Sequence, residues 1–262
     1  LISEALASKN IGFKETQRFA TPRRLALIIE EVAESQRDVK LLRVGPAVSS
    51  AYDENGKATP AALGFAKSCN VELKELKTTT KSGVEKLSYE ALEKGKKSSA
   101  LIPELIGSVL KKLPTPKRMR WGSSKEEFVR PLHWILLLFG EEQLKFRAFG
   151  VSSSNVTRGH RFHNNTEILI DEPTQYEKVL SEVGHIIPNF EKRKDLIRAE
   201  VLKQGSLANA SAVIGEDLLD EVTSLVEYPM ALTGEFDSEF LKVPPEALIL
   251  AMKTHQKCFH MN

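Results

Sequence analysis

The stretch "PTPKRMRWGSSKEEFVRPLHW", residues 114–134, gathers basic and aromatic side chains among few apolar ones. Its candidate contacts for a polyanion are Lys117, Arg118, Arg120, Trp121 and Arg130. An arginine presents a planar fork of donors that can bind one phosphate twice, and a lysine adds a point charge. The indole of Trp121 could stack on an unpaired base, and Gly122 would leave the ring room. The opposing interpretation is a solvated loop that Trp121 anchors to the core.

Two further basic clusters lie elsewhere in the sequence. Arg23 and Arg24 follow Thr21-Pro22, and "TRGHRFH", residues 157–163, supplies Arg158, His160 and Arg161. If these clusters face the same side as residues 117–130, they form a groove that follows a phosphate backbone. If they do not, each is a surface group that contributes well under about 1 kcal/mol to stability.

Charge is distributed unevenly along the chain, although the formal net charge is only +2. Residues 111–130 contain seven basic and two acidic side chains, whereas residues 216–246 contain nine acidic side chains and one lysine. Such an asymmetry favours two surfaces with different partners. Phe236 and Phe240 lie in the acidic stretch and are expected to be exposed there.

The histidines invite a metal site, but their setting argues against one. His160 and His163 are three residues apart, and His255 and His260 flank Cys258 at a spacing of five. Zinc sites of known type show HExxH or CxxC frameworks, and neither motif occurs here. We therefore expect no metal, and interpret these histidines as polar packing groups or phosphate donors.

No catalytic motif is recognisable. The sequence contains no GxSxG elbow, no GxxxxGK[ST] phosphate loop and no GxGxxG after a strand. We therefore assign no catalytic residue and expect no cofactor bound to these residues.

Two cysteines without a spaced partner, Cys69 and Cys258, favour a reducing compartment, which predicts a cytoplasmic protein. The longest apolar run, Ile135 to Phe139, has the length of a strand and is too short to span a bilayer. Because the sequence opens on Leu1 inside an amphipathic pattern and closes on "HQKCFHMN", we interpret it as a piece of a longer polypeptide.

The clearest predicted element is a helix from Ser98 to Lys112, which leads directly into the basic segment. Its apolar residues recur with helical spacing, and Ser98 or Ser99 can cap its start. Pro114 and Pro116 end it. The basic segment thus leaves a helix and enters "HWILLLFG", which we expect to be a buried strand.

The remaining periodicities predict an α+β fold with mixed or antiparallel sheets and packed helices. A turn is expected at Asn55-Gly56. Strands are expected on both sides of Thr21-Pro22 and over residues 86–95, 133–140, 144–151, 166–173, 185–188 and 230–236. Helices are expected over residues 1–10, around residues 63–66, and over residues 174–184, 189–205, 216–229 and 244–256. Inward-facing positions include Val183 and Leu225. The sequence pattern changes after about residue 165. This change predicts two subdomains, one of residues 1–165, which contains the basic segment, and one of residues 166–262.

Six motifs in the same order resemble the β subunit of bacterial glycyl-tRNA synthetase of the heterotetrameric type. They are "FATPRRLAL", "KRMRWG", "FVRPLHWILLLFG", "TRGHRF", "LLDEVTSLVEYPMALTGEFDSEFL" and "MKTHQKCF", and they run from Phe19 to Phe259. The chain would be the N-terminal portion of that longer subunit. Cys258 stands where the family usually carries an aromatic residue, which weakens the case for this thiol as a shared catalytic group.

The resemblance implies a role in ligating glycine to tRNA(Gly) with ATP, in an α2β2 assembly. It places the class II site for glycine and ATP on the α subunit and gives the β subunit a main role in tRNA recognition. On this basis we hypothesise that Lys117, Arg118, Arg120 and Arg130 border a tRNA-facing surface, with Trp121 either stacking on a base or bracing the surface.

Two alternatives stay open at this point. The chain could be a structural module that contacts the α subunit or the rest of the β subunit through the acidic stretch and never touches RNA. It could instead be a metal-dependent hydrolase or editing-like domain built on His160, His163 and His255.

Overall fold

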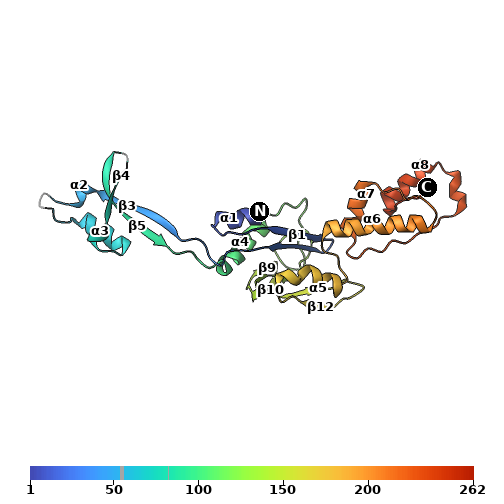
Figure 1. Cartoon of the computed structure of the whole chain (residues 1–262), viewed down its shortest axis with the longest axis horizontal. Helices are drawn as coiled ribbons and strands as arrows, with labels where there is room; N and C mark the ends of the chain where they lie inside the picture. The colour runs from blue at the N-terminus through green and yellow to red at the C-terminus, as the bar shows by residue number, and fades with distance from the viewer. Residues whose placement is uncertain (54–55, 82) are drawn as a thin grey trace. The chain divides into compact units, whose positions relative to one another are not determined.

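The computed structural model describes residues 1–53, 56–81 and 83–262 and confirms the α+β class (Figure 1). The chain divides into two compact units. Unit 1 comprises Leu1–Gly12 and Ala33–Leu105, and unit 2 comprises Phe13–Val32 and Ile106–Asn262. This division differs from the boundary expected at residue 165. Strand β11 (Val156–Arg158) pairs with β12 (Glu167–Leu169) across that point, so one sheet joins the two sides.

Unit 1 is built on an antiparallel sheet of order β3-β5-β4. Its elements are α1 (Ile2–Ser8), β3 (Val39–Ala47), α2 (Val48–Ala51), α3 (Pro60–Cys69), the 3₁₀ turn η1 (Leu73–Glu75), β4 (Lys77–Lys81) and β5 (Val84–Glu93). Ala51, Ala62 and Leu87 form its buried core between α2, α3 and the sheet. The expected helices at residues 1–10 and 63–66 and the strand at 86–95 are confirmed. Of the expected turn at Asn55-Gly56, Asn55 lies outside the described residues, and Gly56 has a φ of +73°.

Helix α4 (Ser98–Lys112) has the predicted bounds, and the division between the units falls inside it. The hydroxyl of Ser98 donates to the carbonyl of Ala33, a segment of unit 1 distant in sequence. This side chain therefore anchors the start of the helix to the preceding chain.

Unit 2 holds the remaining strands in four small sheets, with helices packed beside them. Its strands are β1 (Thr16–Thr21), β2 (Arg24–Ile29), β6 (Ile135–Leu136), β7 (Leu138–Phe139), β8 (Glu142–Gln143), β9 (Arg147–Ala148), β10 (Val151–Ser154), β11 and β12. Its helices are α5 (Tyr176–Glu182), α6 (Phe190–Leu207), α7 (Glu216–Leu225) and α8 (Pro245–Ala251), with 3₁₀ turns at Pro173–Gln175 and Ser238–Lys242 and a π-helical turn at Met252–Gln256.

The main core of unit 2 joins the β1–β2 hairpin to α5 and β12. Phe19 contacts Tyr176 edge to face, with ring centroids 5.6 Å apart. Ile168, Ile170, Leu180 and Ile186 complete this buried cluster. A second cluster, Ile197, Val201 and Leu219, packs α6 against α7. Burial of such apolar groups supplies the main driving force for folding, at about 25 cal/mol per Å².

Several sequence predictions within unit 2 are wrong. Residues 133–140 form two separate two-residue strands that are half-buried, and residues 144–151 hold only β9 and the start of β10. Residues 185–188 and 230–236 are not strands. Val183 and Leu225 are exposed. A short apolar run such as residues 135–139 indicates a segment that is at least partly buried, but it does not determine the backbone conformation of that segment. A strand also needs a pairing partner, and the partner comes from a distant part of the sequence.

Among the residues that the structure describes, no helix combines the length and the apolar character that crossing a bilayer requires.

Candidate nucleic-acid interface

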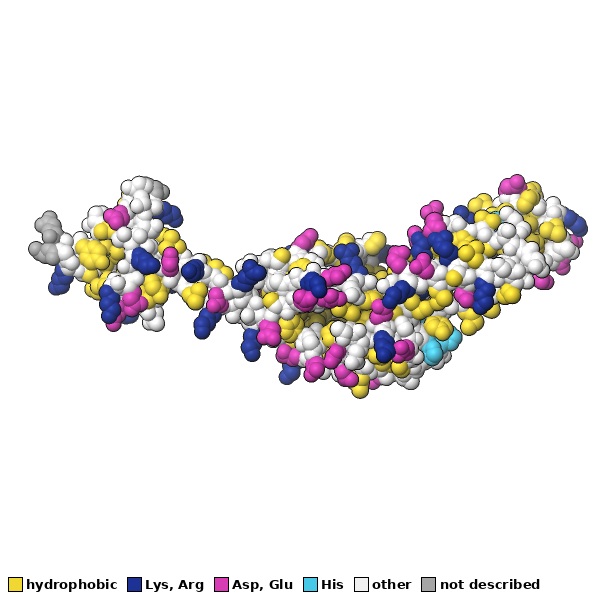
Figure 2. All heavy atoms as spheres, viewed as in Figure 1, with side chains coloured by type: hydrophobic (Ala, Val, Ile, Leu, Met, Phe, Trp, Pro, Cys, Tyr) yellow, Lys and Arg dark blue, Asp and Glu magenta, His cyan; other side chains and the backbone are white. Residues whose placement is uncertain are grey.

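Basic and acidic side chains alternate over the face of the protein seen in Figure 2. No single large basic area dominates that face. A polyanion would therefore bind where basic groups converge locally.

Such a convergence occurs at one pocket of unit 2, of about 330 Å³. We call it the arginine pocket; its lining consists of Arg23, Arg24, His133, Trp134, Arg158, Gly159, Arg161 and Asn165. Two of the three basic clusters identified in the sequence thus meet in space, although more than 130 residues separate Arg24 from Arg158 in the chain. No carboxylate lines this pocket, as far as the structure describes the chain.

The β1–β2 hairpin supplies two of the four arginines. Thr21 pairs with Arg24 at its closed end, so Arg23 lies at the tip and Arg24 begins β2. The hydroxyl of Thr21 accepts from the Arg23 backbone N–H at 3.3 Å, a short-range bond typical of turns.

The other two arginines come from β11 and the segment after it. Arg158 ends β11 opposite Glu167 of β12. Gly159 follows, and a Cβ at this position would lie 2.1 Å from the carbonyl oxygen of Asn164. Only glycine fits here without displacing the loop that carries Arg161 and Asn165.

Arg24 is a buried positioning group, with a relative exposure of 7%. Its Nη1 donates to Oε1 of Glu227, a carboxylate that is itself 5% exposed. Its Nη2 donates to the carbonyls of Arg158 at 2.7 Å and Gly159 at 3.1 Å. Its Nε has no hydrogen-bond partner among the described residues. Burying a charge is costly unless it is paired, so Glu227 holds Arg24 in place.

Arg24 also supports an aromatic wall of the pocket. Its guanidinium carbon lies 5.3 Å from the ring centroid of Trp134, within the range of a cation–π contact. Trp134 is half-buried and lines the pocket. The pocket therefore combines an indole with a guanidinium held against it.

The three remaining arginines of the pocket are exposed. Arg158 forms an ion pair with Glu167 at 3.1 Å, and both side chains are accessible to solvent. Arg161 lies near the ring of Phe162, at 5.7 Å. Exposed pairs of this kind are weak, so these guanidinium groups can exchange their present contacts for a phosphate.

The basic segment, residues 117–130, is not part of the pocket lining, and two of its arginines have internal partners. Arg118 donates to the carbonyls of Lys111 at 3.0 Å and Leu113 at 3.3 Å, which lie at the end of α4. A cation there satisfies free carbonyls and complements the helix dipole. Arg120 pairs with Glu127 at 2.6 Å.

Trp121 braces the same segment. Its ring centroid lies 6.3 Å from that of Phe149, and Phe128 lies 4.8 Å from the same ring. Met119 and Phe128 exchange backbone hydrogen bonds and close the loop. Gly122 has a φ of +57°, and no atom lies within 4 Å of a Cβ built on it. Glycine is therefore favoured here by the backbone conformation of the turn, and the Trp121 ring would have room even if residue 122 carried a side chain. Stacking of Trp121 on a base stays a prediction, as do phosphate contacts of the exposed Lys117 and Arg130.

His160, a candidate for RNA contact, is half-buried beside the arginine pocket and does not line it. Its Nδ1 accepts backbone N–H groups of Phe162 and His163, each at 3.2 Å. Desolvation lowers the pKa of His160 below 6.5, and the charges of His163, Arg24 and His185 lower it further against the opposing effect of Glu227. His160 is therefore a neutral packing group near pH 7.

The histidines do not form a metal centre in the part of the chain that the structure describes, where no group of three or more His, Cys, Asp or Glu side chains is placed to hold an ion. The rings of His160 and His163 lie against each other, with centroids 4.5 Å apart. His163 and His185 both contact Tyr228 edge to face. This arrangement is a packed aromatic cluster and gives no support to the hydrolase alternative.

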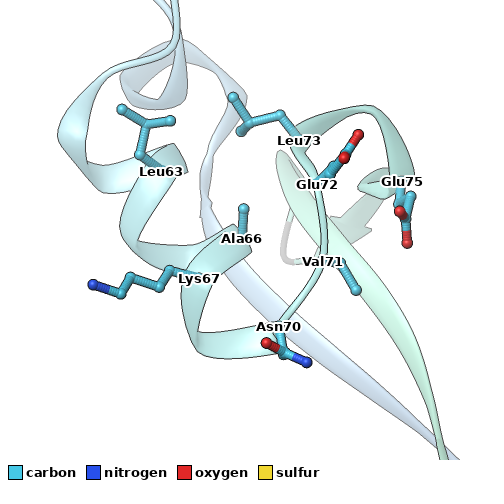
Figure 3. A pocket seen from close by; sticks show the side chains of 8 residues that line it. All are labelled: Leu63, Ala66, Lys67, Asn70, Val71, Glu72, Leu73 and Glu75. Carbon is cyan, nitrogen blue, oxygen red and sulfur yellow. The ribbon is translucent and has the colours of Figure 1, made fainter.

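Unit 1 carries a second, more open pocket of about 570 Å³ between α3 and the segment that follows it. Figure 3 shows Ala66 and Leu73 facing each other across it, while Lys67 and Glu75 extend away on opposite sides. Two carboxylates, Glu72 and Glu75, lie among its lining against one lysine. The charge of this lining is therefore negative on balance and does not favour the binding of a polyanion.

Sequence reasoning missed the residues that give the arginine pocket its form, namely His133, Trp134, Asn165, Gly159 and Glu227. Trp134 and His133 lie at the end of the stretch "PTPKRMRWGSSKEEFVRPLHW", so a signal for them was present. No sequence signal connects Glu227 with Arg24, because the two are 203 positions apart.

Comparisons with known proteins show the family of this chain. A family profile described as "Glycyl-tRNA synthetase beta subunit" matches residues 1–262. The glycine–tRNA ligase beta subunit of Coxiella burnetii (strain RSA 493 / Nine Mile phase I) is 43% identical over 258 residues, which cover 98% of this chain and 37% of that protein. The proteins of the same name from Marinobacter nauticus and Psychromonas ingrahamii are 43% and 41% identical, over 99% and 98% of this chain and 38% of each relative. The chain thus spans less than two fifths of the length of these relatives. Because the match extends over all of its residues, the chain belongs to the glycyl-tRNA synthetase beta subunit family.

Proposed function

We propose that this chain is a non-catalytic part of a glycine–tRNA ligase, in which it contributes to the binding of tRNA(Gly). The relatives carry the name of a ligase subunit, and a ligase for tRNA must hold a large polyanion. Affinity for nucleic acid comes mainly from neutralising phosphates with arginine and lysine.

One observation carries the proposal. Four arginines surround a single pocket, namely Arg23, Arg24, Arg158 and Arg161. In the part of the chain that the structure describes, no carboxylate lines this pocket. Arg24 is held internally, whereas the other three guanidinium groups reach solvent. Arg24 and Arg158 are paired with Glu227 and Glu167, while Arg23 and Arg161 are exposed, so the opening of the pocket presents positive charge that an anion can bind.

The test is binding of the chain to tRNA(Gly) across a series of salt concentrations. We expect the double variant Arg23→Glu/Arg161→Glu to weaken binding at least tenfold at low salt and to flatten the slope of log affinity against log salt. The double variant Lys40→Glu/Lys74→Glu, exposed on unit 1, reverses as many charges and is the matched control. Equal affinity of the pocket variant and the wild type, with both folded, would reject the assignment.

Assembly with the α subunit is the second part of the proposal, and exposed apolar residues support it. Between α7 and the end of α8 the exposed large apolar side chains are Leu225, Tyr228, Met230, Leu232, Phe236, Phe240, Leu241, Val243 and Leu250. Such a concentration marks surfaces that bind other proteins, and the surrounding carboxylates favour a partner with a basic rim.

Sedimentation of the chain with the α subunit tests this part. We expect Phe236→Ser/Phe240→Ser to reduce complex formation about tenfold or more while tRNA binding by the chain is retained. The double variant Val39→Ser/Leu42→Ser, exposed on β3 of unit 1, is the control. A complex that forms without tRNA binding would instead favour a purely structural module.

The chemistry itself is assigned to the α subunit. ATP and glycine are expected to bind there, in an α2β2 assembly located in the cytoplasm. Activation of glycine by the α subunit alone is the expected result of an ATP–pyrophosphate exchange assay, and transfer of glycine to tRNA only after the β subunit is added is the expected result of an aminoacylation assay.

A further inference from the structure

The arginine pocket has the size of a site for one small unit of a polymer. Its volume of about 330 Å³ lies at the low end of the range of about 300–1,000 Å³ that is usual for small-molecule sites. A duplex offers its phosphates on a broad convex surface and keeps its bases stacked inside. A concave site of this size fits a nucleotide that has left such a stack.

The inner wall of the pocket is suited to the flat face of a base. Trp134 presents an indole that is half-buried and contacts the guanidinium of Arg24. Arg24 cannot turn away, because Glu227 and the carbonyls of Arg158 and Gly159 hold its two terminal nitrogens. The aromatic platform is therefore pre-organised, which lowers the entropy lost when a base stacks on it.

The rim is suited to a phosphodiester and to the edge of a base. Arg23, Arg158 and Arg161 are exposed and can each form two bonds to a phosphate. Asn165 offers both a donor and an acceptor, and His133 offers ring nitrogens. These are the groups with which proteins contact splayed-out bases of single-stranded RNA.

We propose that the arginine pocket receives one unpaired nucleotide of an RNA strand, with its base against Trp134 and its phosphate among Arg23, Arg158 and Arg161. This inference rests on the proposed function, since the RNA would be the tRNA. It adds that the site selects unpaired over duplex RNA.

The two tryptophans of the chain provide a direct readout. In a Trp121→Phe variant, Trp134 is the single emitter, and a base stacked on it quenches its fluorescence. In a Trp134→Phe variant, Trp121 is the single emitter; it packs against Phe149 and does not line the pocket, so a base bound in the pocket leaves its emission unchanged, whereas quenching of Trp121 would report stacking at the basic segment instead. The second variant is the matched control for the first.

The experiment titrates the Trp121→Phe variant with a short single-stranded oligoribonucleotide, with a blunt duplex of the same sequence and with adenosine monophosphate. We expect quenching by the single strand at a concentration at least tenfold lower than that needed with the duplex or the mononucleotide. Quenching by the duplex at the same concentration would overturn the selection of unpaired RNA. Quenching by the mononucleotide at the same concentration would assign the pocket to a free nucleotide.

Two variants test the geometry by measuring oligonucleotide affinity. Arg161→Gln removes an exposed guanidinium and is expected to weaken binding several-fold without affecting the fold. Trp134→Ala removes the stacking platform and is expected to weaken binding roughly tenfold, in line with stacking energies at other single-strand sites. Should Trp134→Ala fail to fold, the Arg161→Gln result and the quenching experiment decide the matter alone.

The outcomes separate this inference from the proposed function. If labelled tRNA binds the chain but neither RNA changes the emission of Trp134, the pocket assignment is wrong and the tRNA-binding role stands. If tRNA does not bind while the single strand quenches Trp134, the tRNA-binding role is wrong, and the pocket is a site for an unpaired nucleotide of an RNA other than the tRNA. If tRNA does not bind and the emission stays unchanged, both are wrong.

Discussion

The arginine pocket and the basic segment, residues 117–130, carry the same residue types and use them differently. In the pocket, one arginine is buried and held by Glu227, and three others surround an opening. In the basic segment, Arg118 binds the end of α4, Arg120 pairs with Glu127, and Trp121 packs against Phe149. Local density of charge in a sequence therefore does not reveal which cations are available to a ligand, because each guanidinium can first satisfy groups of its own protein.

The largest expected effect separates the two ion pairs. Glu227→Ala leaves Arg24 buried without its carboxylate and is expected to lower the free energy of unfolding by about 3–5 kcal/mol. Glu127→Ala removes the exposed partner of Arg120 and should change it by less than about 1 kcal/mol. Urea denaturation of both variants measures the difference. Similar losses in the two would show that burial does not distinguish these pairs.

The next effect concerns two glycines. Gly159→Ala places a Cβ against the carbonyl of Asn164 and should displace the loop of Arg161, costing about 1–3 kcal/mol and weakening RNA binding several-fold. Gly122→Ala places alanine at a positive φ in open space, at a cost of about 1–2 kcal/mol.

RNA affinity discriminates between these two glycine variants better than stability does. Gly122→Ala is expected to keep the affinity of the wild type, measured by anisotropy with labelled tRNA. A larger loss of affinity in Gly122→Ala than in Gly159→Ala would reverse the ranking of the two regions.

A smaller effect distinguishes the exposed cations of the basic segment from its internally bonded arginines. Lys117→Gln/Arg130→Gln removes two exposed cations and is expected to reduce the salt slope of tRNA binding by up to about 1.8. Arg118→Gln/Arg120→Gln should reduce it less, because these guanidinium groups would have to leave internal partners to reach a phosphate. Equal slopes for the two double variants would mean that the internal contacts do not restrict the arginines.

The smallest effect is a pH dependence at His160. Its lowered pKa means that the unfolded chain binds a proton more readily than the folded chain does. Stability contributed by neutral His160 is therefore complete above about pH 6.5 and falls as the pH drops from there towards the folded pKa. Protonation at Nδ1 would also remove the acceptor of two backbone N–H groups.

Denaturation between pH 7.5 and 5.5 checks this dependence. His160→Gln is expected to flatten the fall in stability with pH. An identical pH profile for His160→Gln and the wild type would assign the dependence to other groups.

The sequence by itself determined the elements whose signals are local. Helix α4 has the predicted bounds because its apolar period, its starting serines and the prolines after it act within one segment. The β1–β2 hairpin is likewise encoded around Thr21-Pro22. The order of six motifs also predicted the family that the comparison then showed.

Only the tertiary structure decided which basic residues share a site. Arg24, Trp134, Arg158 and Glu227 converge through packing of the hairpin, the β11–β12 sheet and the segment after α7. The strands expected at residues 185–188 and 230–236 did not form for a related reason, since a strand needs a partner that no local pattern supplies. Buried ion pairs and strand registers depend on segments that are distant in the sequence and meet only in the folded chain. A local sequence pattern therefore does not predict them.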